Sequence, residues 1–248
     1  MRASRTERSR VAIVDPHPLA REKIAELVEA RGGEVIWTAG ALQDALGRFR
    51  TSSPDCVIFE FGLPDGSGAQ LLAALRAAPR FVRGVALSGY DQHAYRALTY
   101  AAGGLGYLTK AVGADSLKAA LQEIWAGRVL WTVQEIAMAR AWWARSAEPW
   151  RRLSPRQRGV ALGVAAHLTN KETAARLGLR ESTVKGYLQE TLAKIGVSTR
   201  DELVAWMKAS TLTDPLVRPL LDSHDPTDLP GEPRAQRRPE EIRSSPHL

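Results

Sequence analysis

The stretch LSPRQRGVALGVAAHLTNKETAARLGLRESTVKGYLQETLAKIGVSTRDEL, residues 153–203, contains the signals for three helix starts. Each start has a Ser or Thr followed three residues later by Gln or Glu, the capping-box pattern in which side chains and backbone amides bond reciprocally. The pairs are Ser154 with Gln157, Thr169 with Glu172, and Thr199 with Glu202. Pro155 suits the first helical position, and Gly178 suits the left-handed residue that ends a helix. These signals predict a small all-helical unit.

A further helix is predicted over Glu181–Ile195. Its apolar residues recur at helical spacing and form one stripe: Val184, Leu188, Leu192 and Ile195. The outward side of the same helix is polar and carries Ser182, Lys185, Gly186 and Gln189. A short helix, a tight turn and a second helix with a polar face is the geometry that enters the major groove of DNA.

Net charge is concentrated in this helical unit. Residues 151–200 contain ten Lys or Arg and three acids, a surplus of +7, whereas residues 11–130 balance twelve bases with twelve acids. A basic surplus confined to one small unit is the electrostatic footprint of a nucleic-acid reader. The alternative is a basic amphipathic unit that binds no DNA.

Five short apolar runs alternate with helix-patterned segments in the first half of the chain. The runs are Val11–Val14, Val35–Trp37, Cys56–Phe59, Val85–Leu87 and Tyr107–Leu108. The helical segments are Leu19–Ala30, Ala41–Phe49, Ala69–Ala77, Ala94–Ala102 and Ser116–Ala126. Such an order predicts an α/β fold with a doubly wound, five-stranded parallel sheet. Functional residues are then expected directly after the strands.

The remaining segments divide the chain further. Residues 1–10 are predicted to be a basic N-terminal arm, residues 131–150 a Trp-rich linker, and residues 211–248 a disordered tail with seven of the fourteen prolines. The linker tryptophans serve either to dock two domains, which we favour, or to bind a partner. No apolar run approaches the roughly 20 residues that span a bilayer, and no secretory segment is found. We therefore expect a cytoplasmic protein. The sequence offers no Ser-His-Asp or Cys-His arrangement and no histidines at ligand spacing, so we expect neither an enzyme nor a metal site.

The helical unit closely resembles the LuxR-type helix-turn-helix, because the words NKE, LG and TVK fall at that family's spacing. The resemblance implies a C-terminal all-α DNA-binding domain over residues 151–210, in which the last helix helps the protein to dimerise. Thr183 and Lys185 would contact the backbone and base edges of DNA, and Lys171 a phosphate. Arg180 stands where the family usually has a capping serine and would bind phosphate instead. The full set of expected DNA-binding residues is Lys171, Arg180, Ser182, Thr183, Lys185 and Gln189.

Residues 11–130 resemble a response-regulator receiver, a flavodoxin-like fold, and the whole chain resembles the NarL/FixJ class. The words VAIVDPHPLAR, PDCVIFEFGLPDGSG, ALSGY and GLGYLTKA mark the ends of strands one, three, four and five. The resemblance implies a phosphorylated aspartate after the third strand, an acidic pair for Mg²⁺, and a hydroxyl and a lysine for the phosphoryl oxygens. Ser88, Tyr107 and Lys110 match the hydroxyl, switch-aromatic and lysine positions.

Two positions of this receiver depart from the family pattern. The phosphoacceptor position holds Glu60, and the acidic pair is Asp15 followed by Pro16, so that one Mg²⁺ ligand is missing. Asp65 lies too far along the chain to replace the acceptor. We therefore predict an atypical receiver, with a pocket of Asp15, Ser88, Tyr107 and Lys110 around Glu60, that holds an active-like or ligand-controlled state without Mg²⁺ or phosphotransfer.

These observations predict a homodimeric transcription regulator that binds a palindromic or near-palindromic promoter. Two further partners fit this prediction, a small-molecule ligand in the altered pocket and RNA polymerase. A conventional two-component regulator that a histidine kinase phosphorylates is the first alternative, and for the receiver alone an inert structural remnant is another. The second is an interaction module that sequesters another regulator or RNA polymerase and never binds DNA.

Overall fold

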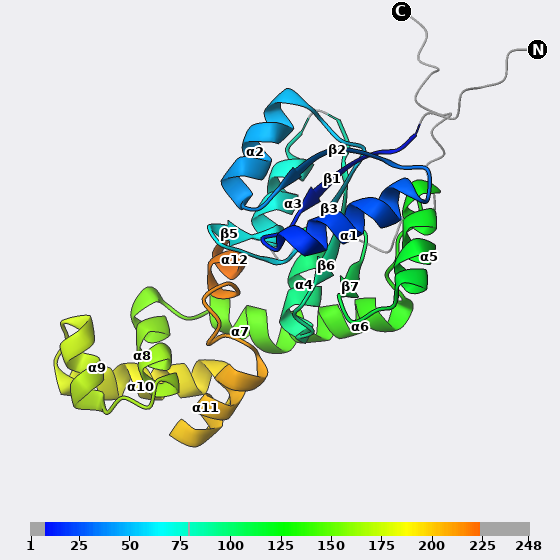
Figure 1. Cartoon of the computed structure of the whole chain (residues 1–248). Helices are drawn as coiled ribbons and strands as arrows, with labels where there is room; N and C mark the ends of the chain where they lie inside the picture. Colours follow the sequence, from blue (N-terminus) through cyan, green and yellow to red (C-terminus); the bar gives the residue numbers. More distant parts are fainter. Residues whose placement is uncertain (1–7, 79, 224–248) are drawn as a thin grey trace, which may run out of the picture. The chain divides into compact units, whose positions relative to one another are not determined.

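The computed structural model describes residues 8–78 and 80–223, which form two compact units (Figure 1). The first unit takes the described residues up to Gly89 together with Thr99–Thr132, and the second takes Tyr90–Leu98 and the described residues from Val133 onward. Most of the predicted arm, residues 1–7, and the tail from residue 224 onward lie outside the described residues.

A parallel five-stranded sheet in the order β2-β1-β3-β6-β7 forms the centre of the first unit. Its strands are β1 (Arg10–Val14), β2 (Glu34–Ala39), β3 (Cys56–Phe59), β6 (Arg83–Ser88) and β7 (Tyr107–Thr109). Each strand contains one of the predicted apolar runs, so the predicted doubly wound sheet is confirmed. A short antiparallel hairpin, β4 (Gly62–Leu63) with β5 (Gly66–Ser67), follows β3 and has no counterpart among the predicted strands.

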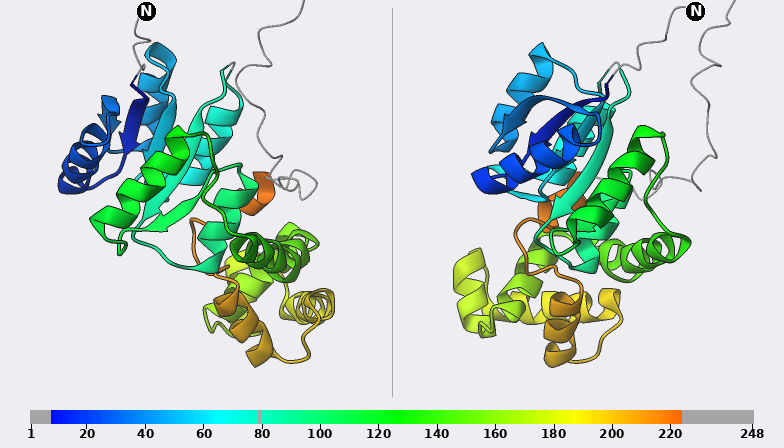
Figure 2. Two further views of the ribbon diagram at one scale, coloured as in Figure 1. Left: turned by 90° about the vertical axis from the view of Figure 1, so that its right-hand side faces the viewer. Right: turned by 45° about the vertical axis from the view of Figure 1, so that its right-hand side comes forward.

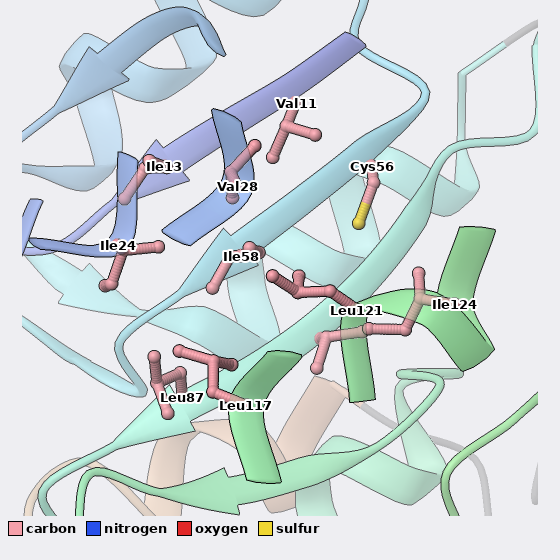
Figure 3. Close-up of a cluster of buried hydrophobic side chains, with 11 residues drawn as sticks. Val11, Ile13, Ile24, Val28, Cys56, Ile58, Leu87, Leu117, Leu121 and Ile124 are labelled. Carbon is pink, nitrogen blue, oxygen red and sulfur yellow. The ribbon is translucent and has the colours of Figure 1, made fainter. Parts of the chain in front are cut away.

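Helices α1 (Pro18–Glu29) and α5 (Ala114–Trp125) pack on one face of the sheet (Figure 3). Alternate strand residues reach that face, because successive side chains of a strand point to opposite sides. Both helices and three strands contribute to the buried cluster, which contains Val11, Ile13, Ile24, Val28, Cys56, Ile58, Val85, Leu87, Leu117, Leu121 and Ile124. This apolar layer holds the strand ends, and therefore the residues after them, in fixed positions.

Helix α3 (Gly68–Arg76) packs closely against β6. A Cβ atom at Gly84 would lie 2.2 Å from Cδ2 of Leu72, so a larger residue at this point of the strand would force the Leu72 side chain to move. The remaining helices of the first half are α2 (Leu42–Thr51) and α4 (His93–Ala101). Helix α4 is divided, because its residues up to Leu98 belong to the second unit and the rest belong to the first.

The predicted linker is helical. It contains α6 (Val133–Trp142), a π-helical turn η1 (Trp143–Ala147) and α7 (Glu148–Arg151). Trp142 and Trp143 are both buried, and their rings meet edge to face at 6.2 Å. Trp131 belongs to the first unit, where its indole donates to the carbonyl of Gly104 at 2.6 Å.

The next four helices after the linker form a bundle: α8 (Pro155–Ala165), α9 (Asn170–Leu177), α10 (Glu181–Ile195) and α11 (Arg200–Ala209) (Figure 2). All three predicted capping boxes are formed, at Ser154, Thr169 and Thr199. Gly178 ends α9 with a φ of 65°, in the left-handed region that the sequence predicts. The predicted helix Glu181–Ile195 has the observed bounds, and the all-α C-terminal domain is confirmed.

Two predicted boundaries are wrong. Arg10 does not belong to a free arm, because it begins β1, and its guanidinium donates to the carbonyl of Ser53 at 3.0 Å. Residues 211–223 are not a disordered tail, because the chain continues through a turn into α12 (Arg218–Ser223) with Leu212, Val217, Leu220 and Leu221 buried. Burial of these apolar residues stabilises the segment despite its prolines. None of the described helices has the length and apolar character needed to cross a membrane.

Candidate functional site

Glu60 follows β3 directly, at the edge where the carboxyl ends of the parallel strands meet. It is only 3% exposed, and both of its carboxylate oxygens have partners. Oε1 accepts hydrogen bonds from the backbone amide of Phe61 at 2.7 Å and from the hydroxyl of Ser88. Oε2 accepts a hydrogen bond from the backbone amide of Gly89 at 3.0 Å. The sheet edge thus surrounds one carboxylate with the kinds of donors that stabilise an oxyanion.

Lys110 follows β7 and lies between two buried carboxylates. Its Nζ is 2.9 Å from Oε2 of Glu60 and 2.5 Å from Oδ2 of Asp15. Burial alone would lower the pKa of this ammonium group, but the hydrogen bonds and charges of Asp15 and Glu60 outweigh burial and raise the pKa above its ordinary value. Lys110 is therefore a fixed cation that neutralises part of the charge of both carboxylates.

Asp15 follows β1 and is 1% exposed. Its Oδ1 accepts a hydrogen bond from the amide of His17 at 2.8 Å and lies 3.0 Å from Nδ1 of the same residue. The backbone carbonyl of Asp15 accepts from Arg21 at 2.6 Å. These contacts hold the carboxylate toward Lys110, and the ring of His17 is turned to Asp15.

The donor set does not fit Mg²⁺. This ion takes oxygen ligands in an octahedral arrangement, usually with one or two carboxylates and several waters. Here the carboxylates of Asp15 and Glu60 both contact the ammonium group of Lys110, and Pro16 has no side-chain oxygen. Within residues 8–78 and 80–223, no group of three or more His, Cys, Asp and Glu side chains is placed to hold a metal ion.

The structure brings Asp15, Glu60, Ser88 and Lys110 together, as the sequence predicts. Tyr107 lies at the start of β7 and is buried. The amides of Phe61 and Gly89 were missed at the sequence level, because backbone donors have no residue type of their own. Gly89, in the word ALSGY, was the available signal, since glycine lets a backbone amide approach an anion closely.

Asp65 has a structural role on another helix. Its two carboxylate oxygens accept hydrogen bonds from the amides of Leu42 at 2.6 Å and Gln43 at 2.9 Å, the first residues of α2. The N-cap residue Ala41 has no side chain that could do this. These backbone hydrogen bonds, the one from Gln43 above all, lower the pKa of Asp65 below its ordinary value. Asp65 therefore caps α2 and is not part of the Glu60 site.

The expected DNA-binding residues lie on an accessible surface. Helix α10 is exposed at Ser182, Thr183, Lys185 and Gln189, while Val184 is fully buried against Val160 of α8 and Ala174 of α9. Arg180 occupies the N-cap of α10 without a side-chain cap, as its residue type predicts. Gln157 links α8 to α10, because its side chain donates to Glu190 at 2.7 Å and accepts from Lys194 at 2.9 Å.

Eight basic residues of the bundle fall into two groups. Four of them donate to backbone carbonyls and have a structural role: Arg156, Arg158, Lys194 and Arg200. On α9, α10 and the turn between them, four others have neither a side-chain hydrogen bond nor an ion pair with any described residue: Lys171, Arg176, Arg180 and Lys185. The second group supplies cations that are free to meet phosphates.

Comparison with known proteins agrees with both units. Residues 11–122 match the family described as Response regulator receiver domain, and residues 151–207 match Bacterial regulatory proteins, luxR family. The chain is 30% identical over 197 residues to the DNA-binding transcriptional activator DevR/DosR of Mycobacterium tuberculosis, an alignment that covers 78% of this chain and 91% of the relative. It is 32% identical over 194 residues to the transcriptional regulatory protein UhpA of Salmonella typhimurium, covering 78% and 94% of the two chains.

Among solved structures, the fold is similar to the two-component response regulator RcsB in its DNA complex. The TM-score is 0.54 at 17% identity, and the match covers 82% of this chain and 99% of that chain. At this identity the similarity concerns the fold alone.

Proposed function

The chain belongs to the response-regulator family that joins a receiver domain to a LuxR-type regulatory domain, and from this premise we propose that it is a DNA-binding transcription regulator whose receiver works without phosphorylation. The family consists of regulators rather than enzymes. The observation that carries the second part of the proposal is the carboxylate of Glu60, held by Ser88, Gly89 and Lys110.

These three residues supply what a phosphoryl group would need. In the family pattern a hydroxyl and a lysine bind the phosphoryl oxygens, and here the same two groups bind a permanent carboxylate. The longer side chain of glutamate brings that carboxylate to them. Because these donors already hold the carboxylate, they are not available to an incoming phosphoryl group, and no second acid beside Asp15 recruits Mg²⁺. We therefore infer that Glu60 fixes an active-like state of the receiver.

The DNA-binding part of the proposal is supported by the free cations on α9, α10 and their turn. Phosphate contacts by Lys and Arg supply most of the salt-dependent affinity of DNA-binding proteins. The relatives named as DNA-binding or transcriptional regulators support the same assignment. We propose that the protein acts in the cytoplasm as a homodimer on promoter DNA, with one α10 helix in each half-site.

Incubation with a small phosphodonor and Mg²⁺ tests the receiver. We expect the intact mass of the wild-type protein to stay unchanged. The matched variant combines Glu60→Asp with Pro16→Asp, which restores the acceptor and the acidic pair, and we expect it to gain one phosphoryl group. Stoichiometric phosphate on Glu60 of the wild-type chain would overturn the proposal and favour the conventional regulator that a histidine kinase phosphorylates.

Salt dependence separates the regulator from a protein-interaction module. Binding through phosphates predicts an affinity for promoter DNA that falls steeply as salt rises, because each phosphate contact releases counterions. A module that sequesters another regulator or RNA polymerase through an apolar interface predicts no such fall. Absence of measurable DNA binding at low salt would favour that module.

A further inference from the structure

A segment beyond the luxR-family match folds as part of the second unit. The match ends at residue 207, whereas the described chain continues through residues 211–221. Leu212, Val217 and Leu221 have no exposed surface, and Leu220 is 2% exposed. Burial of this kind is typical of a domain core rather than of a tail. The segment therefore has a packing role that the family pattern does not require.

The turn at the start of this segment has an unfavourable backbone conformation. Thr211 has a φ of 59°, a left-handed conformation that disfavours residues with a Cβ atom. The amide of Leu212 closes the turn on the carbonyl of Met207 at 3.0 Å. Arg218 then donates from Nη1 to the carbonyls of Leu212 and Thr213, each at 3.1 Å. These bonds and the buried leucines keep a strained turn in one conformation.

The segment also contacts α4. The hydroxyl of Tyr95 donates to Oδ2 of Asp214, a residue 119 positions later in the chain. Oδ1 of the same carboxylate accepts from the amide of Leu216 at 2.7 Å, so Asp214 has a fixed orientation. Tyr95 has no exposed surface. A buried phenol that donates to a carboxylate makes a charge-assisted hydrogen bond, which is stronger than one between neutral groups.

The part of α4 that Asp214 holds adjoins the Glu60 site in the sequence. Gly89, whose amide donates to Glu60, is the last residue of the first unit before Tyr90. The ring of Tyr90 lies 5.1 Å from the ring of Tyr95, and Arg96 lies 3.2 Å from Glu135 of α6. Residues 90–98 are thus joined directly to a residue that binds Glu60, and they belong to the unit that contains α10.

We propose that residues 211–221 form an intrachain clamp that fixes the first half of α4 to the DNA-binding unit. The clamp acts through the hydrogen bond between Tyr95 and Asp214. Residues 90–98 follow Gly89 directly in the chain, and the clamp makes those residues move with α10. This proposal rests on these contacts alone and holds whether or not the receiver is phosphorylated.

Amide hydrogen exchange of the full-length protein, read by mass spectrometry, tests the clamp. We expect Tyr95→Phe, which removes only the hydroxyl, to speed exchange in residues 211–221 by about tenfold, the effect of losing one hydrogen bond to a charged group. Asp214→Ala should in turn speed exchange in residues 90–98. The double variant should exchange no faster than the more affected single variant, because both changes remove the same hydrogen bond.

Thr213→Ala is the matched control, since Thr213 is an exposed neighbour of Asp214 and should leave both segments unchanged. Exchange in β3, Cys56–Phe59, should stay at the wild-type rate in every variant. Wild-type exchange of residues 211–221 in Tyr95→Phe would overturn the proposal. So would a change confined to the segment that carries the substitution. If Asp214→Ala unfolds the second unit and exposes α10, the Tyr95→Phe result alone decides.

Discussion

Oε2 of Glu60 lies 2.9 Å from Nζ of Lys110, and the carboxylate of this pair is withdrawn from water. A buried charge without its partner is costly, because removing one member of a buried ion pair leaves the other unsolvated. Lys110 also faces the buried Asp15, so its loss would leave two carboxylates without a cation. The buried charges of Asp15 and Glu60 therefore depend on Lys110, and loss of this one residue should destabilise the folded protein.

Lys110→Met should destabilise the protein strongly. We expect a loss of about 3 kcal/mol in the free energy of unfolding, measured by urea denaturation. Adding Glu60→Gln removes one of the two buried carboxylate charges that Lys110→Met leaves without a cation. The double variant should therefore be more stable than Lys110→Met alone, and the two changes in free energy will not add. Lys118→Met is the control, because Lys118 pairs with the exposed Asp115 and such surface pairs contribute little to stability. Equal losses for Lys110→Met and Lys118→Met would contradict the described pocket.

Asp65 should contribute a pH-dependent part of the stability. Its pKa is lowered in the folded protein, so its contribution is present above the ordinary aspartate pKa and is lost as pH falls through the lowered value. Asp65→Ala should cost about 1 kcal/mol at neutral pH, the usual effect of losing a helix cap. The difference from wild type should shrink in acid, as urea titrations between neutral pH and pH ~3 would reveal.

Asp44→Ala supplies the comparison for Asp65 on the same helix. Asp44 forms an exposed pair with Arg48, four residues later, at 2.8 Å, and this pair should contribute about 0.3–0.5 kcal/mol. A loss for Asp65→Ala no larger than that for Asp44→Ala would show that the cap contributes nothing.

Patterns carried by residue type and spacing could be predicted from the sequence. The parallel strands, the capping boxes and Glu181–Ile195 follow from local hydrophobic periodicity and side-chain hydrogen bonding, which act within a few residues. Asp15, Glu60, Ser88 and Lys110 could be grouped because the ends of parallel strands meet at one edge. The direction of the Glu60 carboxylate toward Lys110 could not be derived from spacing.

Features that depend on distant parts of the chain could not be predicted. Asp65 reaches α2, more than twenty residues earlier, and Tyr95 reaches Asp214, so neither interaction has a local sequence signal. The prolines around the packed segment 211–221 predict a disordered tail, because in composition they outweigh a few leucines. Burial of those leucines depends on surfaces that the sequence pattern does not describe.

DNA binding should separate the two groups of basic residues. Lys185→Ala should weaken promoter binding about tenfold, and Thr183→Ala less, because only the first removes a charged group that can meet a base edge or a phosphate. If Lys185 or Lys171 binds a phosphate, its replacement should also reduce the slope of log K against log salt by about 0.9 for each phosphate that is no longer neutralised. Fluorescence anisotropy on promoter DNA at several salt concentrations measures both quantities.

Arg156→Ala should behave differently from these lysine variants. Its guanidinium donates to the carbonyl of Leu177 at 2.8 Å, so we expect the substitution to lower the stability of the bundle and leave the salt slope unchanged. Unchanged affinity in Lys185→Ala and Thr183→Ala together would contradict the placement of α10 in the groove.

Replacing Gly186 tests whether the glycine, which lowers the stability of α10, allows this helix to approach DNA closely. Glycine in the middle of a helix costs about 1 kcal/mol relative to alanine. Apart from the adjoining residues and backbone of α10 itself, no atom of the described residues lies within 4 Å of the position that a Cβ atom would occupy. Gly186→Ala should therefore stabilise the protein by about 1 kcal/mol in urea denaturation. If the missing side chain lets α10 approach the groove closely, the same variant should bind promoter DNA more weakly. A variant that is both more stable and equally tight would show that Gly186 has no role in the approach to DNA.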